Sequence, residues 1–96
     1  MYFGNQKFLV AGMSKSGAAS ADFLLKRGAV VYMFDDIADG AVQKTMGELA
    51  ARGAIPVAQG GVAAAVNECD VLVLSPGIPI DHELPVAFRK KGKRII

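Results

Sequence analysis

Short apolar runs recur along this chain, and segments with helical spacing separate one run from the next. Most of the runs are apolar at every position, which is typical of strands buried on both faces of a parallel sheet. The expected strands are residues 7–11, 29–34, 54–57, 71–74 and 94–96. The expected helices are residues 18–27, 40–52, 60–67 and 82–91.

Strands that alternate with helices predict a parallel sheet with right-handed crossovers. We therefore expect an α/β, Rossmann-like fold, with a five-stranded, mainly parallel sheet flanked by helices. Pro56 lacks a backbone donor, so the short strand around it is expected at an edge of the sheet. The 96 residues suffice for one domain, and the hydrophobic content of 52% argues against disorder.

A glycine-bracketed loop joins the first strand to the first helix. Gly12 permits a backbone conformation that other residues resist, and Gly17 lets the helix pack closely on the sheet. At the start of that helix, the backbone N–H groups of Lys15, Ser16 and Gly17 are expected to face an anion. Ser14 stands where a dinucleotide-binding fingerprint has its middle glycine, which weakens the match to that fingerprint. The loop predicts a diphosphate site.

Two further polar features follow strands that are expected near this loop. Asp35 ends the second strand, where an acidic residue commonly bonds a ribose hydroxyl. Asp39 is better placed to cap the next helix, so Asp35 is expected to be free for a ligand, and the second charge of Asp36 disfavours a 2′-phosphate. Ser75, Pro76 and Gly77 follow the fourth strand, as a stiff loop that can hold a donor in place.

Several function classes find no support in the sequence. It has no Walker-type phosphate loop, no Ser/His/Asp set and no metal-ligand cluster, so we expect no catalytic and no metal-binding residues. A net charge of +2 does not predict binding to nucleic acid or membranes. No apolar run approaches the roughly 20 residues of a membrane span, and residues 1–5 begin no secretory signal.

The isolated titratable residues are expected to be structural. Cys69 is the only cysteine, which favours a cytoplasmic protein, and its acidic neighbours should raise its pKa rather than activate it. His82 is expected to serve as a helix cap. The basic stretch 89–94 is expected to be a solvated helix end, with a docking patch for an acidic partner as the alternative.

Taken together, three segments resemble the N-terminal domain of the Mur ligase family, most closely its D-glutamate-adding branch. They are residues 10–19, the stretch Phe34-Asp35-Asp36, and residues 70–79 with their Ser-Pro-Gly-Ile loop. The resemblance extends from Lys7 to Ile96. It implies a domain that binds the UDP part of UDP-N-acetylmuramoyl-L-alanine, in a cytoplasmic enzyme of peptidoglycan precursor synthesis.

The resemblance also implies residue roles. Lys15, Ser16 and Gly17 would hold the diphosphate, and Asp35 and Asp36 would contact uracil and ribose. Ser75 and Gly77 would line the opposite wall, and Ser14 and Pro76 are further expected substrate-binding residues. No cofactor is implied for this domain, whereas ATP and Mg would bind a central ATPase domain, and a C-terminal domain would bind the amino acid. Both lie outside residues 1–96. The alternative is an NAD-binding domain of a dehydrogenase or a ligand-sensing regulator.

Overall fold

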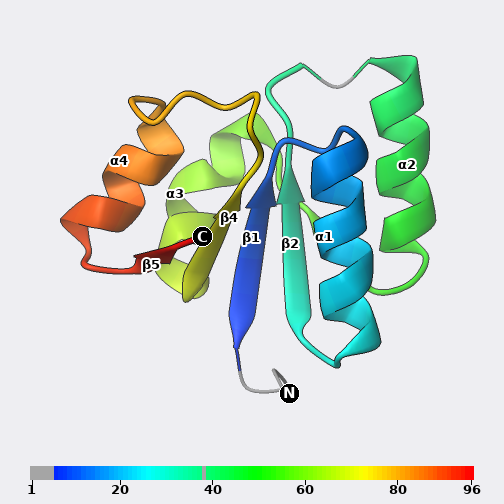
Figure 1. Ribbon diagram of the computed structural model, residues 1–96, viewed down its shortest axis with the longest axis horizontal. Coiled ribbons are helices and arrows are strands. Elements are labelled where there is room, and N and C mark those ends of the chain that lie inside the picture. The colour runs from blue at the N-terminus through cyan, green and yellow to red at the C-terminus, as the bar shows by residue number, and fades with distance from the viewer. Residues whose placement is uncertain (1–5, 38) are drawn as a thin grey trace.

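A computed structural model describes residues 6–37 and 39–96, so residues 1–5, on which the signal-peptide expectation rests, lie outside it. In the described part of the chain, five strands form one sheet in the order β3-β2-β1-β4-β5, and every ladder is parallel (Figure 1). The strands are β1 (Lys7–Ala11), β2 (Val30–Phe34), β3 (Ile55–Pro56), β4 (Val71–Leu74) and β5 (Arg94–Ile95). The predicted fold is confirmed, and the strand with Pro56 lies at an edge.

Within the described residues, four α-helices and one short 3₁₀ helix connect the strands. They are α1 (Lys15–Lys26), α2 (Gly40–Ala50), η1 (Gln59–Gly61), α3 (Val62–Glu68) and α4 (Glu83–Lys90). Helix α1 begins earlier than the apolar pattern predicted, inside the glycine loop itself. The buried face of α4 consists of Leu84, Pro85 and Phe88.

The sheet separates two apolar cores, as alternation along β1 requires. Phe8 and Val10 pack with buried residues of α1 and α2, whereas Leu9 and Ala11 pack with those of α3 and α4. In Figure 1 the α1–α2 pair and the α3–α4 pair accordingly lie on opposite sides of the central strands. Both faces of β1 are therefore covered, which explains why its sequence is an unbroken apolar run.

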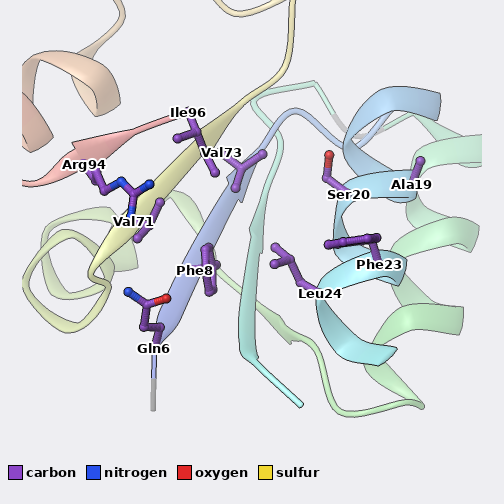
Figure 2. A pocket seen from close by; sticks show the side chains of 10 residues that line it. All are labelled: Gln6, Phe8, Ala19, Ser20, Phe23, Leu24, Val71, Val73, Arg94 and Ile96. Atoms are coloured by element: carbon purple, nitrogen blue, oxygen red, sulfur yellow. The ribbon is translucent and has the colours of Figure 1, made fainter. Parts of the chain in front are cut away.

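A recess of 680 Å³ lies between α1 and the part of the sheet formed by β4 and β5 (Figure 2). Phe8, Val71 and Val73 belong to its floor, while Phe23 of α1 and the terminal Ile96 are 47% and 59% exposed. The recess is mostly apolar, and it lies on a face of the sheet rather than at the strand ends. Among the described residues, no helix is long and apolar enough to cross a membrane.

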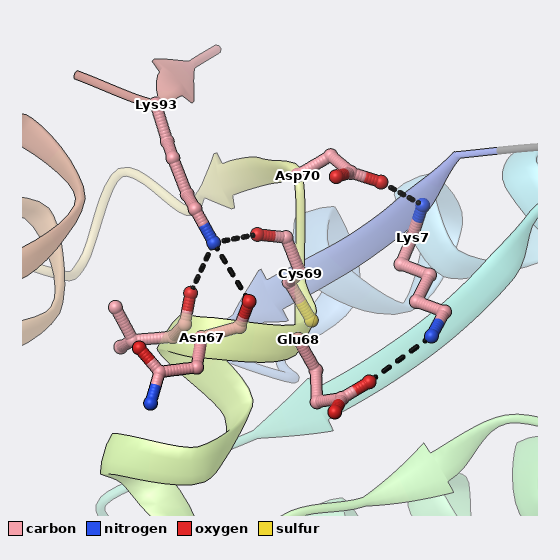
Figure 3. A network of polar contacts seen from close by, with 7 residues as sticks. Lys7, Asn67, Glu68, Cys69, Asp70 and Lys93 are labelled. Atoms are coloured by element: carbon pink, nitrogen blue, oxygen red, sulfur yellow. Dashed lines mark hydrogen bonds and ion pairs between the residues drawn. The ribbon is translucent and has the colours of Figure 1, made fainter. Parts of the chain in front are cut away.

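Within the basic stretch 89–94, Lys93 has a structural role, because its ammonium binds protein groups. Its ammonium donates to the carbonyl oxygens of Val66, Asn67 and Cys69, at 2.6, 2.9 and 2.7 Å (Figure 3). These carbonyls end α3, where a cation also complements the helix dipole. The prediction of a solvated stretch holds for the exposed Lys90 but is wrong for Lys93.

Cys69 is fully buried beside the same helix end. Burial raises the pKa of its thiol to about 12, and Asp70 and Glu68 add to the shift, whereas Lys93 opposes it. The predicted direction is confirmed. Its largest cause is desolvation, which the sequence argument did not include.

Replacing Lys93 by methionine should lower the free energy of unfolding by about 2 kcal/mol, because three carbonyls would lose a charged donor. Urea denaturation followed by circular dichroism measures the change. Lys90→Met removes the same charge from an exposed site without a described partner, and should shift stability by about 0.5 kcal/mol or less. Equal effects of the two substitutions would show that Lys93 acts only through net charge.

The Cys69 thiol should react with iodoacetamide at pH 8 only after unfolding, because its native pKa lies well above that pH. The native pKa exceeds the ordinary value of 9.0, so the thiol's contribution to stability is complete below about pH 9. It is lost as the pH rises toward 12. Mass spectrometry of the alkylated protein, with and without urea, tests the accessibility. Rapid labelling of the folded chain would contradict it.

Candidate functional site

The glycine loop connects the carboxyl end of β1 to the amino end of α1. Gly12 has φ +88°, a conformation that side chains with a Cβ rarely adopt. Gly17 is buried so closely against the loop that a Cβ built on it would lie 1.7 Å from the Gly12 oxygen. The two glycines therefore hold the start of α1 directly over the end of β1.

The first turn of α1 leaves backbone donors at this edge of the sheet. Ser14 is the N-cap residue with an extended backbone, and its side chain makes no capping hydrogen bond. Ser14, Lys15 and Ser16 are exposed. Because the first N–H groups of a helix lack intrahelical partners and carry the positive end of its dipole, this turn suits an anion.

Asp35 is not free, contrary to the sequence-based expectation. One of its carboxylate oxygens accepts the Met13 N–H at 2.7 Å, and the other accepts the Ile37 N–H at 2.9 Å. Asp39 does cap α2, as predicted, by accepting the Val42 N–H. The Asp35 carboxylate thus ties the glycine loop to the segment after β2, and a ligand could use only its remaining lone pairs.

Ser75 fixes the third segment of the site. Its hydroxyl donates to the Gly12 carbonyl at 2.8 Å, and its side chain is buried. The Ile78 N–H donates to the Ser75 carbonyl at 3.0 Å, which closes a turn with Pro76 in its second position. The hydroxyl therefore braces the loop from within rather than facing solvent.

These segments enclose a cavity of 210 Å³ at the carboxyl ends of β1, β2 and β4. Its lining residues are Gly12, Ser14, Asp35, Asp36, Ile37, Ser75, Gly77, Ile78 and Pro79. The recess beside α1 is larger, but it has few polar groups. The strand-end cavity brings a helix N-terminus and two carboxylates together, as nucleotide sites of such sheets do.

The structure brings together only part of the predicted set in the cavity wall. Ser14, Asp35, Asp36, Ser75 and Gly77 line the cavity, whereas Lys15, Ser16, Gly17 and Pro76 are outside its lining. The sequence analysis missed the apolar wall of Ile37, Ile78 and Pro79. The isoleucine after Asp-Asp offered a signal in the sequence, since it belongs to no apolar run. In the structure Ile37 is 81% exposed.

The groups at the site are backbone donors, two carboxylates and apolar side chains. Within residues 6–37 and 39–96, no group of three or more His, Cys, Asp or Glu side chains could hold a metal ion. Asp36 bonds His82, which also caps α4 through the Leu84 N–H, as predicted for this histidine. The arrangement offers N–H donors, one exposed lysine and an apolar wall.

Known structures share this fold. The structure titled AtPrR2 in apo form superposes with a TM-score of 0.75 at 21% identity, over 94% of this chain and 36% of its own. An imine reductase variant from Myxococcus stipitatus in complex with NAD+ gives 0.66 at 19% identity, over 95% and 31%. The chain is a Rossmann-like α/β domain with a polar site at its strand ends.

The sequence comparisons give its family. Residues 6–96 match the family described as Mur ligase MurD-like, N-terminal domain. A UDP-N-acetylmuramoylalanine–D-glutamate ligase from Acidobacterium capsulatum is 38% identical over all of this chain and 21% of its own length. A ligase of the same name from Shouchella clausii is 42% identical over 77% of this chain and 16% of its own length. The chain belongs to the family of MurD-like Mur ligase N-terminal domains, and it spans about a fifth of these relatives.

Gly17→Ala should destabilise the domain by about 3 kcal/mol or more, because the new methyl group would overlap the Gly12 carbonyl. Gly47→Ala in α2 is the matched control, since nothing lies within 4 Å of its Cβ position. That substitution should stabilise the domain by up to about 1 kcal/mol. Urea denaturation of both variants measures the difference. If Gly17→Ala were as stable as Gly47→Ala, the close approach of loop and helix would be wrong.

Proposed function

We propose that this chain is the substrate-anchoring domain of an ATP-dependent ligase that adds D-glutamate to UDP-N-acetylmuramoyl-L-alanine in peptidoglycan precursor synthesis. The domain binds the UDP part of that substrate. The observation that carries the proposal is the strand-end cavity with the N-terminus of α1 at its edge, in a chain of this family. The names of the matched relatives supply the reaction.

The site residues have distinct roles in this proposal. The N–H groups of Lys15, Ser16 and Gly17 bind the diphosphate at the start of α1, with the Ser16 hydroxyl as a further donor. Ser14 and Gly77 line the two sides of the nucleoside cavity. Asp35 and Ser75 act through the backbone groups that they hold, and Ile37 and Ile78 supply apolar contact.

Catalysis belongs to other parts of the enzyme. Residues 1–96 form one N-terminal domain of a longer cytoplasmic polypeptide, whose remainder binds ATP, Mg and the incoming amino acid. No residue of this domain is assigned to the chemical step. Its contribution is to anchor a remote part of the substrate, so that binding energy positions the reacting carboxylate elsewhere.

An NAD-binding domain is the competing function, because the solved structures of the same fold include an imine reductase in complex with NAD+. At 19% identity that likeness concerns the fold alone. Parallel titrations of the chain with UDP and with NAD, followed by backbone NMR, separate the two functions. We expect UDP to shift the amides of residues 15–17, 35–37, 75, 77 and 78, with no comparable response to NAD. A response to NAD alone would overturn the proposal.

Ser16→Ala should weaken UDP binding about fivefold, as expected for the loss of one hydrogen bond of about 1 kcal/mol. Isothermal titration calorimetry gives the dissociation constants. Ser20→Ala is the matched control, because Ser20 lies one turn further along α1 and lines the apolar recess instead. The control should bind UDP like the wild type. If Ser16→Ala also did so, the diphosphate would not lie at this helix N-terminus.

A further inference from the structure

A hydrogen bond from His82 to Asp36 connects the segments that follow β4 and β2, both of which line the strand-end cavity. Asp36 follows β2, and His82 lies at the start of α4, 46 residues later. Their Oδ2 and Nε2 atoms are 2.6 Å apart, and the His82 side chain is only 15% exposed. The segment between Ser75 and His82 contributes Gly77, Ile78 and Pro79 to the cavity wall.

The hydrogen bond to the second ring nitrogen of His82, Nδ1, determines which of the two nitrogens carries the proton. The Leu84 N–H donates to Nδ1 at 3.1 Å, so Nδ1 is an acceptor and bears no proton. The neutral ring then has its proton on Nε2 and donates it to Asp36. One imidazole therefore caps α4 with one nitrogen and holds Asp36 with the other.

Asp36 is held within the protein on its other side as well. Its Oδ1 accepts from the Gln59 amide at 3.4 Å, which connects the segment after β2 to η1. The ring of Phe34 lies 6.4 Å from the His82 ring, and Arg89 of α4 donates to the Ile80 carbonyl at 2.9 Å. The two contacts of His82, with Asp36 and with Phe34, hold residues 75–82 against the end of β2. The bonds from His82 and Gln59 engage both carboxylate oxygens of Asp36.

We propose that His82 is a positioning residue of the nucleotide site, which it shapes by holding the Ser75–His82 segment against Asp36. Asp36 then serves binding through His82 rather than by contacting the ligand. This inference rests on the proposed function, because it assigns the cavity to UDP. It explains how an aspartate that lines the cavity has both oxygens bonded to protein groups.

Two substitutions separate the two roles of the imidazole. His82→Asn places an acceptor near Nδ1 and is a good N-cap, but it is too short to reach Asp36. His82→Gln places an amide donor near Nε2 and retains the bond to Asp36, while it loses the good cap. We expect His82→Asn to weaken UDP binding about fivefold with little change in urea midpoint. His82→Gln should bind UDP nearly like the wild type despite a lower midpoint.

A double-mutant cycle with Asp36→Ala tests whether the two residues act as a pair. Asp36→Ala should weaken UDP binding about as much as His82→Asn, and the double variant should bind no more weakly than either single variant. Additive losses would overturn the proposal. So would wild-type affinity of His82→Asn, or equal losses in His82→Asn and His82→Gln, since His82 would then be a helix cap alone.

A ligand-free readout distinguishes this inference from the proposed function. Ring ¹⁵N chemical shifts should show the Nε2–H tautomer, and the Gly77 and Ile78 amides should shift in His82→Asn but not in His82→Gln. If the wild type failed to bind UDP while these signals appeared, the proposed function would fail and the positioning of the loop would stand. Unchanged Gly77 and Ile78 amides in His82→Asn would overturn the positioning role.

Discussion

The contact of Gly12 with Gly17 and Ser75 is the constraint on which the rest of the site depends. The Gly12 carbonyl lies under the first turn of α1, where no Cβ fits, and it accepts the Ser75 hydroxyl at 2.8 Å. One carbonyl group thus fixes the ends of β1 and β4 and the start of α1 relative to one another. A built Cβ on Gly12 would itself lie 2.9 Å from the Ser75 Cβ, so the packing is tight from both sides.

The fold was predictable because its signals are local. Unbroken apolar runs such as that of β1 exist only where both faces of a strand are covered, and Pro56 excluded its strand from the sheet interior. The start of α1 was placed too late, because its first turn contains Lys15, Ser16 and Gly17, which carry no apolar periodicity. Tertiary contact at Gly17 rather than propensity puts this turn in the helix.

The site was predictable in its location but not in its bonding. The segments after β1, β2 and β4 meet because parallel strands end at one edge, and this follows from the strand pattern alone. The partners of Asp35 could not be predicted from the sequence. They are the backbone N–H groups of Met13 and Ile37, and every residue except proline has such a group. The same holds for Lys93, whose three carbonyl partners could not be read from a run of basic residues.

The central position of β1 has a consequence for synthesis on the ribosome. The register pairs Phe8 with Val71, so β1 must wait for the synthesis of β4 before its second edge is covered. At ordinary translation rates of about 5–20 residues per second, that wait is on the order of several seconds. Throughout it, the nascent chain presents an open apolar strand edge, and edges of this kind pair readily with other extended segments. Chaperone demand and misassembly of this domain should therefore peak before β4 emerges from the exit tunnel, and decline once Ser75 reaches Gly12.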